Sequence, residues 1–313
     1  MFKSISKSFD RKSSKNPLVS IIIPVYNRET FIADTLNSVD SQLYRPIEII
    51  LVNDGSTDNT LQIVKNWDLL HTKPGIYMMI LNQANQGAPS ARNRGIQKAK
   101  GLYLQFLDSD DTLEPTKIIK QIEILEKTTS DLAICDFRLI DDKGQYIKTY
   151  SNNGNLLTRF AQGWSIYTSS PLIRSSLIKG KIYWNPSLKI NQDIDFLFKT
   201  VALAPNYIYT PGAWCNYFQH SLPRISNSGQ KTQYHIRAIS LFSFSTSAHV
   251  SLSIHTRMII YGAILRLSIM FFYAITASPL IYAFREIVST FRAYKNYISF
   301  QLFGRSKRRD RSS

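Results

Sequence analysis

Four short apolar segments lie in the first third of the chain and constrain its fold more than any other feature. They are Val19–Val25, Ile47–Val52, Ile76–Leu81 and Leu102–Leu107. Segments of this length, mostly without polar alternation, are typical of buried parallel strands. Stretches with helical periodicity separate them, so strand and helix alternate along the chain. That alternation predicts a doubly wound, mostly parallel α/β sheet.

Apolar stripes with helical spacing support this order. One stripe consists of Phe31, Ile32, Leu36, Val39 and Leu43, and a second of Ile118, Ile119, Ile122 and Leu125. We expect Pro115 in the first turn of the second helix, where proline is tolerated. Later in the chain we expect two strands, Leu132–Leu139 and Tyr207–Tyr217, and a helix, Asn191–Ala202.

The formal net charge of +16 is concentrated at the two ends of the chain. Residues 1–18 hold five Lys or Arg and one Asp, and residues 231–313 hold twelve Lys or Arg and two acids. The 21 bases and 19 acids between them nearly balance. A nucleic-acid-binding protein more often carries basic charge over its folded surface, so we expect no nucleic-acid partner. Basic ends beside an apolar stretch fit an anionic membrane surface better.

These patterns divide the chain into a basic segment (1–16), an α/β domain (17–230) and a mainly helical, basic C-terminal region (231–313). In that last region, residues 258–284 carry a single charge, Arg266. Three interpretations of this stretch stay open: a helix that spans a membrane, one buried in a core or dimer interface, and one lying in the membrane plane. The sequence does not define the oligomeric state.

The expected location is cytoplasmic, with peripheral attachment to the inner face of the membrane as an option. The first 18 residues lack the apolar segment of a secretory signal. The only two cysteines, Cys135 and Cys215, have no metal-ligand spacing, and we expect both to be reduced.

Acidic residues follow two of the predicted strands. Asp54 comes after the second strand, where Asp-Gly also fits an ordinary turn. Asp108, Asp110 and Asp111 come after the fourth, and repulsion among their carboxylates favours a bound cation. Hard oxygen ligands suit Mg²⁺ or Mn²⁺. A solvated acidic turn is the simpler alternative for this loop.

Three ordered segments make the chain similar to known proteins. They are VSIIIPVYNRE (19–29), VNDGSTDNT (52–60) and NQGAPSARNRGIQKAKGLYLQFLDSDD (85–111). Together they resemble the family 2 glycosyltransferases, which have the GT-A fold, over roughly residues 17–225. The resemblance implies a metal-dependent, inverting transferase that moves a sugar from a nucleotide-sugar, with UDP as the usual nucleotide, to a glycan or lipid-linked acceptor. Bacterial-type surface polysaccharide or glycoconjugate synthesis is the implied setting.

The resemblance also implies roles for individual residues. Nucleotide contacts fall on Pro24, Tyr26, Glu29, Asp54, Arg92 and Asp108. The metal ligands are Asp110 and Asp108, and His220 is a candidate ligand of the metal or diphosphate. In NQDIDFLFK (191–199), Asp193 takes the place of the general base, and Gln192 replaces the customary Glu. Phe218 stands where Arg is common in the closing segment.

Two other function classes remain to be tested. The pattern Asp108-x-Asp110-x-Thr112 also fits a haloacid-dehalogenase-like phosphatase, although that motif normally follows the first core strand of such an enzyme. A basic membrane adaptor without catalysis would need the charged tail and not the acids. Residue roles that rest on one position alone also have structural alternatives: Asp193 fits a helix N-terminus, and Arg92 fits a helix surface.

Overall fold

The structure is a computed structural model that describes residues 16–70, 74–161, 166–188, 192–204 and 206–219, together with Gly262. The chain divides into two compact units, Met1–Arg159 with Trp164–Ser226, and Phe160–Gly163 with Asn227–Ser313. His220 and nearly all of residues 231–313 lie outside the described residues. Within the described part, no helix is both long enough and apolar enough to cross a bilayer. The candidate membrane segment 258–284 is described only at Gly262.

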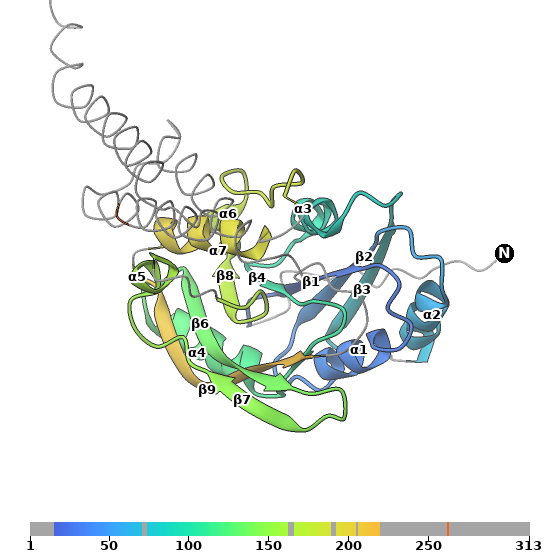
Figure 1. The fold of residues 1–313 in the computed structure, drawn as a ribbon, viewed down its shortest axis with the longest axis horizontal. Coiled ribbons are helices and arrows are strands. Elements are labelled where there is room, and N and C mark those ends of the chain that lie inside the picture. Colours follow the sequence, from blue (N-terminus) through green and yellow to red (C-terminus); the bar gives the residue numbers. More distant parts are fainter. Residues whose placement is uncertain are drawn as a thin grey trace, which may run out of the picture. The chain divides into compact units, whose positions relative to one another are not determined.

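In the described part of the chain, nine strands form one mixed sheet in the order β3-β2-β1-β4-β8-β6-β9-β5, with β7 paired to β6 (Figure 1). The strands are β1 (Val19–Val25), β2 (Ile47–Asn53), β3 (Ile76–Asn82), β4 (Tyr103–Phe106), β5 (Thr112–Leu113), β6 (Leu132–Ile140), β7 (Tyr146–Tyr150), β8 (Pro171–Arg174) and β9 (Ile208–Phe218). The pairs β1–β2, β2–β3, β1–β4 and β6–β9 are parallel, and the other four are antiparallel. The predicted doubly wound α/β sheet is confirmed. Its first four strands form one continuous parallel part, and β6 and β9 form a separate parallel pair.

Helices cover both faces of this sheet. They are α1 (Ile32–Asp40), α2 (Thr60–Leu70), α3 (Ala88–Lys98), α4 (Lys117–Lys127), α5 (Leu156–Ala161), α6 (Ser175–Ile178) and α7 (Gln192–Leu203). Figure 1 shows α1 and α2 on one side of β1–β3 and α3 on the other. Leu43 does not belong to the first helix: α1 ends at Asp40 and Leu43 is 65% exposed. Pro115 likewise lies just before α4 rather than within its first turn.

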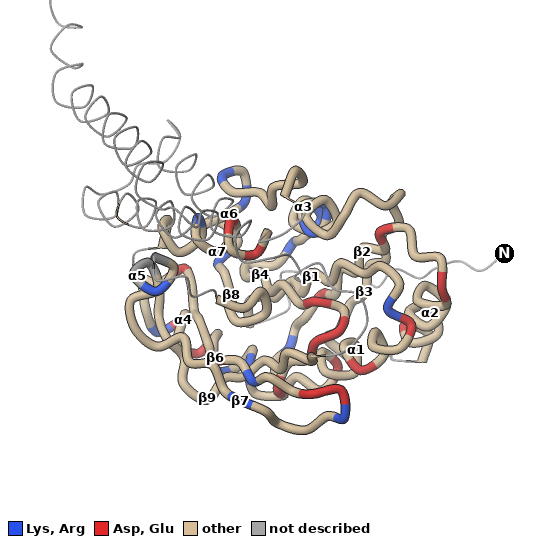
Figure 2. The backbone as a smooth tube through the Cα atoms, in the orientation of Figure 1, with Lys and Arg blue, Asp and Glu red and all other residues tan. Residues whose placement is uncertain are grey.

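The core follows directly from the apolar segments. All seven residues of β1 and of β2 are buried, as parallel strands covered on both faces require. Helix α3 approaches β1 closely at Gly95, where a Cβ atom would lie 2.4 Å from Ile22 Cγ2. Any larger residue at position 95 would therefore force either the Ile22 side chain or the helix that carries Arg92 to shift. Charged residues of both signs are interspersed along the described backbone, in keeping with the balanced charge of this part (Figure 2).

Pro24 lies in a central strand, where its missing N–H would ordinarily leave a gap in the ladder. The pairing of β1 with β4 ends at Ile22 and Phe106, and Ile22 O accepts the last bond on that side, from Leu107 N, at 3.1 Å. Backbone groups alternate sides along a strand, so Pro24 faces the β4 side beyond this last bond. Proline is tolerated there because β1 and β4 have already separated, and the sheet opens at this point.

Candidate functional site

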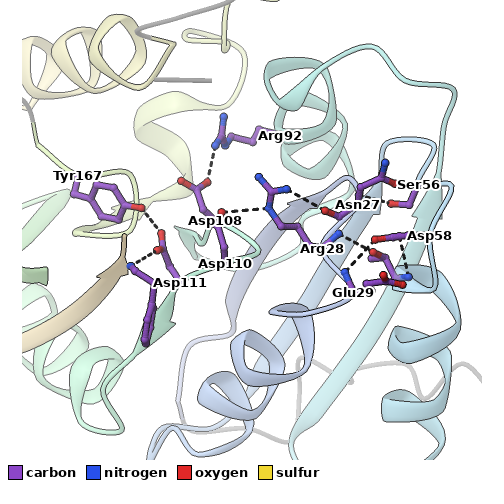
Figure 3. Close-up of polar contacts among 12 residues, drawn as sticks. Asn27, Arg28, Glu29, Ser56, Asp58, Arg92, Asp108, Asp110, Asp111 and Tyr167 are labelled. Atoms are coloured by element: carbon purple, nitrogen blue, oxygen red, sulfur yellow. Dashed lines mark hydrogen bonds and ion pairs between the residues drawn. The ribbon is translucent and has the colours of Figure 1, made fainter. Parts of the chain in front are cut away.

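The predicted site residues after β1, β2 and β4 lie at the carboxyl ends of neighbouring parallel strands (Figure 3). The strand order 3-2-1-4 changes direction between β1 and β4, and ligands of open α/β sheets bind at such a switch point. The sheet opens there because β1 and β4 diverge after Ile22 and Phe106. The loops that follow these strands therefore surround the expected ligand position.

The loop after β1 is fixed to the loop after β2 by reciprocal hydrogen bonds. Asn27 has a positive φ of 48°, and its Oδ1 accepts a bond from Thr57 N at 2.8 Å. Asn27 N donates to Ser56 Oγ at 3.1 Å. Glu29 Oε2 accepts from Asn59 N at 2.9 Å, while Glu29 N donates to an Asp58 oxygen at 3.2 Å. Glu29 thus contacts backbone at the start of α2, and its role toward a nucleotide stays a prediction.

Tyr26 and Pro24 differ in their exposure. The Tyr26 side chain is 43% exposed beside these loops, where an aromatic ring is available to a ligand. Pro24 is buried within β1. Both lie on the strand and loop that the sequence predicted.

Asp54 is only 3% exposed and organises the loop between β3 and α3. Its Oδ1 accepts bonds from Gln83 Nε2 at 2.7 Å and from Gln86 N at 2.9 Å. Its Oδ2 accepts a bond from Gly87 N at 2.8 Å. A buried carboxylate needs such partners, and here they come from the protein itself. Asp54, at the end of β2, therefore connects this strand to the residues that precede α3.

The acidic loop after β4, Asp108–Asp111, meets two arginines from different elements. Arg92 Nη2 lies 2.6 Å from Asp108 Oδ1, and Arg28 Nε lies 3.2 Å from Asp110 Oδ2. Figure 3 shows the two ion pairs on either side of the loop. The Arg28 pair bridges the opening between β1 and β4. Sequence reasoning missed Arg28, although its place directly after the first strand was a usable signal.

Asp111 faces away from these arginines and is fully buried. Its carboxylate accepts bonds from the Tyr167 hydroxyl and from Phe218 N, the latter at 3.2 Å. Burial, followed by the nearby charges of Asp110 and Asp108, raises the pKa of Asp111 well above its usual value. Burial also raises the pKa of Tyr167, with Asp111 as the next cause, so the phenol keeps its proton to donate. The three acids of this loop therefore form one crowded electrostatic group.

Arg92 is an internal residue with 7% exposure, which rules out the helix-surface alternative. Its guanidinium carbon lies 4.2 Å from the centre of the Trp184 ring. Trp184 in turn stacks on Phe196 of α7 at 4.3 Å and meets Phe106 of β4 edge-on. Arg92 Nη1 also donates to Gln192 Oε1 at 3.4 Å. Arg92 thus connects the acidic loop to the first residue of α7.

The N-terminal part of α7 carries Asp193 and Asp195 in different surroundings. Asp193 is partly exposed, whereas Asp195 is 3% exposed and accepts a bond from Lys199 Nζ at 2.8 Å. Burial raises the pKa of Asp195, and the Lys199 ammonium opposes that rise. The two acids therefore lie on different sides of the helix, as their spacing predicted.

The donor chemistry of the acidic loop fits a divalent cation. Asp108 and Asp110 supply hard carboxylate oxygens, and their side chains are 23% and 15% exposed. After burial, the charges of Asp110 and Asp108 are the next causes that raise the pKa of Asp111, so these two acids concentrate negative charge in this loop. In the described residues, however, no three His, Cys, Asp or Glu side chains are gathered as a ready metal site. The arginine pairs would have to rearrange for a cation to bind both acids.

Comparisons with known proteins agree with the sequence pattern. Residues 20–185 match the model of the family described as "Glycosyl transferase family 2". An uncharacterised glycosyltransferase of Rickettsia typhi is 34% identical over 206 residues, which cover 63% of this chain and 63% of that protein. The chain thus spans less than two thirds of the length of this relative.

Two solved structures are similar in fold. Residues 1–349 of TarS from S. aureus, in complex with UDP-GlcNAc, match with a TM-score of 0.65 and 22% identity, over 80% of this chain and 72% of that one. A mannosyltransferase from Pyrobaculum calidifontis, in complex with GDP-Man and Mn²⁺, matches with a TM-score of 0.57 and 17% identity, over 91% and 84%. These similarities confirm the predicted fold class. Neither the phosphatase nor the adaptor alternative finds support among them.

Proposed function

Because the chain belongs to glycosyl transferase family 2, we propose that it transfers a sugar from a nucleotide-sugar to an acceptor hydroxyl with inversion at the anomeric carbon. The observation that carries this proposal is the meeting of the β1 and β4 loops through Arg28 and Asp110 at the switch point of the sheet. An acidic loop at that position suits the diphosphate end of such a donor once a cation is bound.

The nucleotide is proposed to lie over the loops after β1 and β2. Tyr26 offers a partly exposed ring there, and Pro24 and Glu29 shape the loop that carries it. Asp54 supports this surface by holding the N–H groups of Gln86 and Gly87 in place. UDP is our proposed nucleotide. The similar structures contain both UDP-GlcNAc and GDP-Man, so the base is a point for experiment.

Asp110 and Asp108 are proposed to hold Mn²⁺ or Mg²⁺, with His220 as a further candidate ligand. A divalent cation bound there would neutralise the charge of the departing diphosphate. Arg28 and Arg92, which now pair with the two acids, would supply positive charge beside the same group. Arg92 has the second task of keeping Asp108 in place.

Asp193 is proposed as the general base. It would take the proton of the acceptor hydroxyl while the hydroxyl oxygen bonds to the anomeric carbon and the bond from that carbon to the diphosphate oxygen breaks. Gln192 ties the start of α7 to Arg92, and so links the base to the acidic loop. A nucleoside diphosphate and the glycosylated acceptor are the products.

The acceptor is proposed to be a glycan or a lipid-linked saccharide in surface polysaccharide or glycoconjugate synthesis. Residues 231–313 are proposed as a separate basic region that attaches the protein peripherally to an anionic membrane on the cytoplasmic side. Release of the full chain from membranes by high salt is the expected behaviour. Retention until detergent is added would contradict peripheral attachment.

A nucleotide-sugar screen tests the proposed activity. UDP-, GDP- and dTDP-sugars are added to the full chain with and without Mn²⁺, and thermal stabilisation and nucleotide release are both measured. We expect one sugar nucleotide to stabilise the fold and to be slowly hydrolysed, with larger effects when Mn²⁺ is present. Stabilisation by none of them, or release of phosphate from simple phosphomonoesters instead, would contradict a glycosyltransferase.

A further inference from the structure

A groove lies outside the loops described above, where β6, β7 and β9 meet the residues that follow β5. Figure 1 shows these three strands side by side, as their pairing requires. The groove has a volume of about 540 Å³, within the usual range for small-molecule sites. The lining residues that matter here are Glu114, Arg138, Tyr146, Trp214, Asn216 and Phe218.

Charges in the groove balance one another. Arg138 Nη1 lies 3.2 Å from Glu114 Oε1, and both side chains are about one third exposed. The Arg138 guanidinium also lies 4.6 Å from the centre of the Trp214 ring. Asn216 Nδ2 donates to the same Glu114 oxygen at 3.1 Å. With no excess charge, the lining offers aromatic faces and hydrogen-bonding groups. An uncharged, polyhydroxylated ligand fits this lining better than a phosphate or an anionic lipid headgroup.

Residues that line the groove also contact the acidic loop or the strand that follows it. Phe218, at the end of β9, donates its N–H to Asp111 Oδ1, and Thr112 pairs with Asn216 between β5 and β9. Glu114 follows Asp110 by four residues, so their Cα atoms are at most about 14 Å apart. A ligand of several linked sugars could therefore occupy the groove while one end approaches the acidic loop.

We propose that this groove binds the acceptor as an uncharged oligosaccharide. The inference rests on the proposed transferase function and adds the substrate class and the surface that holds it. Tyr146 and Trp214 would contact the sugar rings, and Glu114, Arg138 and Asn216 would bond their hydroxyls. Two other occupants, an anionic membrane and a second copy of this chain, are separate outcomes of the test.

The test uses the full chain and two exposed positions that are adjacent on β7. Tyr146 lines the groove and is 60% exposed, whereas Ile147 is 48% exposed and is not among the lining residues. Tyr146→Ala removes the groove ring, and Ile147→Ala removes a neighbouring apolar side chain as the matched control. Both positions are exposed enough that we expect unchanged thermal unfolding. Trp214→Ala serves as a second groove variant.

Each protein is applied to an array of uncharged di- to hexasaccharides and, separately, to phosphatidylglycerol vesicles. We expect wild type and Ile147→Ala to bind the same oligosaccharides, and Tyr146→Ala to bind them about tenfold more weakly or worse. Equal binding by both variants would overturn the proposal, as would binding to none of the array. The proposal would also be overturned if Tyr146→Ala changed only binding to the vesicles, or only the mass of the protein in sedimentation.

UDP binding to wild type is measured on the same preparation to separate the two proposals. If UDP binds and no oligosaccharide does, the acceptor groove is refuted and the transferase proposal stands. If oligosaccharides bind through Tyr146 and no nucleotide-sugar does, the groove stands as a glycan site and the transferase proposal fails.

Discussion

Arg92 and Asp108 form an ion pair with 2.6 Å between Nη2 and Oδ1, in which the arginine is almost fully buried. The same guanidinium stacks on Trp184 and reaches Gln192 at the start of α7. One side chain of α3 thus contacts both the loop proposed to hold the cation and the helix proposed to carry the base. This arrangement couples the stability of the fold to the geometry of the site.

Arg92→Ala should lower the free energy of unfolding by about 2–4 kcal/mol, because it removes packing against Trp184 and leaves Asp108 without its partner. Arg94→Ala on the same helix is the control. Arg94 lies near the surface and donates to Asn82 O at 2.7 Å, so its loss should cost about 0.5–1.5 kcal/mol. Urea unfolding of both variants measures the difference. Equal losses would mean that Arg92 does not have this structural role.

Asp110→Ala should abolish the gain in UDP affinity that Mn²⁺ provides. Loss of a charge-assisted contact corresponds to about 1.5–3 kcal/mol, or about a ten- to hundredfold weaker affinity. Titration calorimetry with UDP, with and without Mn²⁺, is the measurement. Asp34→Ala, an exposed acid on α1, controls for a general change of charge. If Asp110→Ala binds UDP as tightly as wild type does, both with and without Mn²⁺, Asp110 is not a metal ligand.

The parallel part of the fold was predictable because local sequence determines it. The first strand has the expected bounds, and the next two each extend one residue further than expected. The apolar segments of β1 and β2 are buried on both faces, and that of β3 is half-buried. The boundaries that failed depend on distant contacts. Gln42 Nε2 bonds Glu114 O at 2.9 Å just beyond the end of α1, and a contact across 72 residues leaves no local signal.

The sequence predicted which loops form the candidate site, but not which residues pair with one another within it. The acids after β4 were visible as a cluster, yet Asp110 pairs with Arg28 across 82 positions and Asp111 with Tyr167 across 56. Trp184 showed no motif either, although it supports Arg92. In the second half of the sheet, the predicted strands 132–139 and 207–217 are confirmed to within one residue as β6 and β9. Strand β8 was not predicted, because it has only four residues and begins with Pro171. Its antiparallel pairing to β4 and β6 depends on tertiary packing.

Asp195 should make stability depend on pH. Burial raises its pKa in the folded state, so the folded protein binds this proton more tightly than the unfolded chain does. The resulting stabilisation is complete below the usual Asp value of about 3.9 and is lost as pH rises through the raised folded pKa. Asp195→Asn cannot titrate. The stability of wild type relative to Asp195→Asn should therefore fall as pH rises.

Urea unfolding at several values between about pH 4 and about pH 7 measures this difference, with Asp34→Asn as an exposed control that should show little change. If the stability of wild type relative to Asp195→Asn rises with pH instead, the pKa of Asp195 is lowered in the folded protein rather than raised. This result would mean that attraction to Lys199, 2.8 Å away, outweighs burial and holds the pKa of Asp195 low.

Asp193→Asn separates catalysis from binding. Asparagine keeps the size and hydrogen-bonding reach of the side chain but cannot accept the proton of the acceptor hydroxyl. General-base contributions are about 10²–10⁴-fold, equivalent to about 3–5 kcal/mol of barrier, so kcat should fall by that factor. UDP affinity should stay unchanged, because the proposed nucleotide and cation contacts come from the loops after β1, β2 and β4.

Asp195→Asn is the matched control two positions away. Its buried pair with Lys199 affects folding rather than proton transfer, so at a permissive temperature its rate should remain within a few fold of wild type. Transfer rate and UDP affinity are measured side by side for both variants, once the screens above have identified a donor and an acceptor. An Asp193→Asn enzyme with near-normal turnover, or one that loses UDP affinity in proportion to its rate, would exclude Asp193 as the general base.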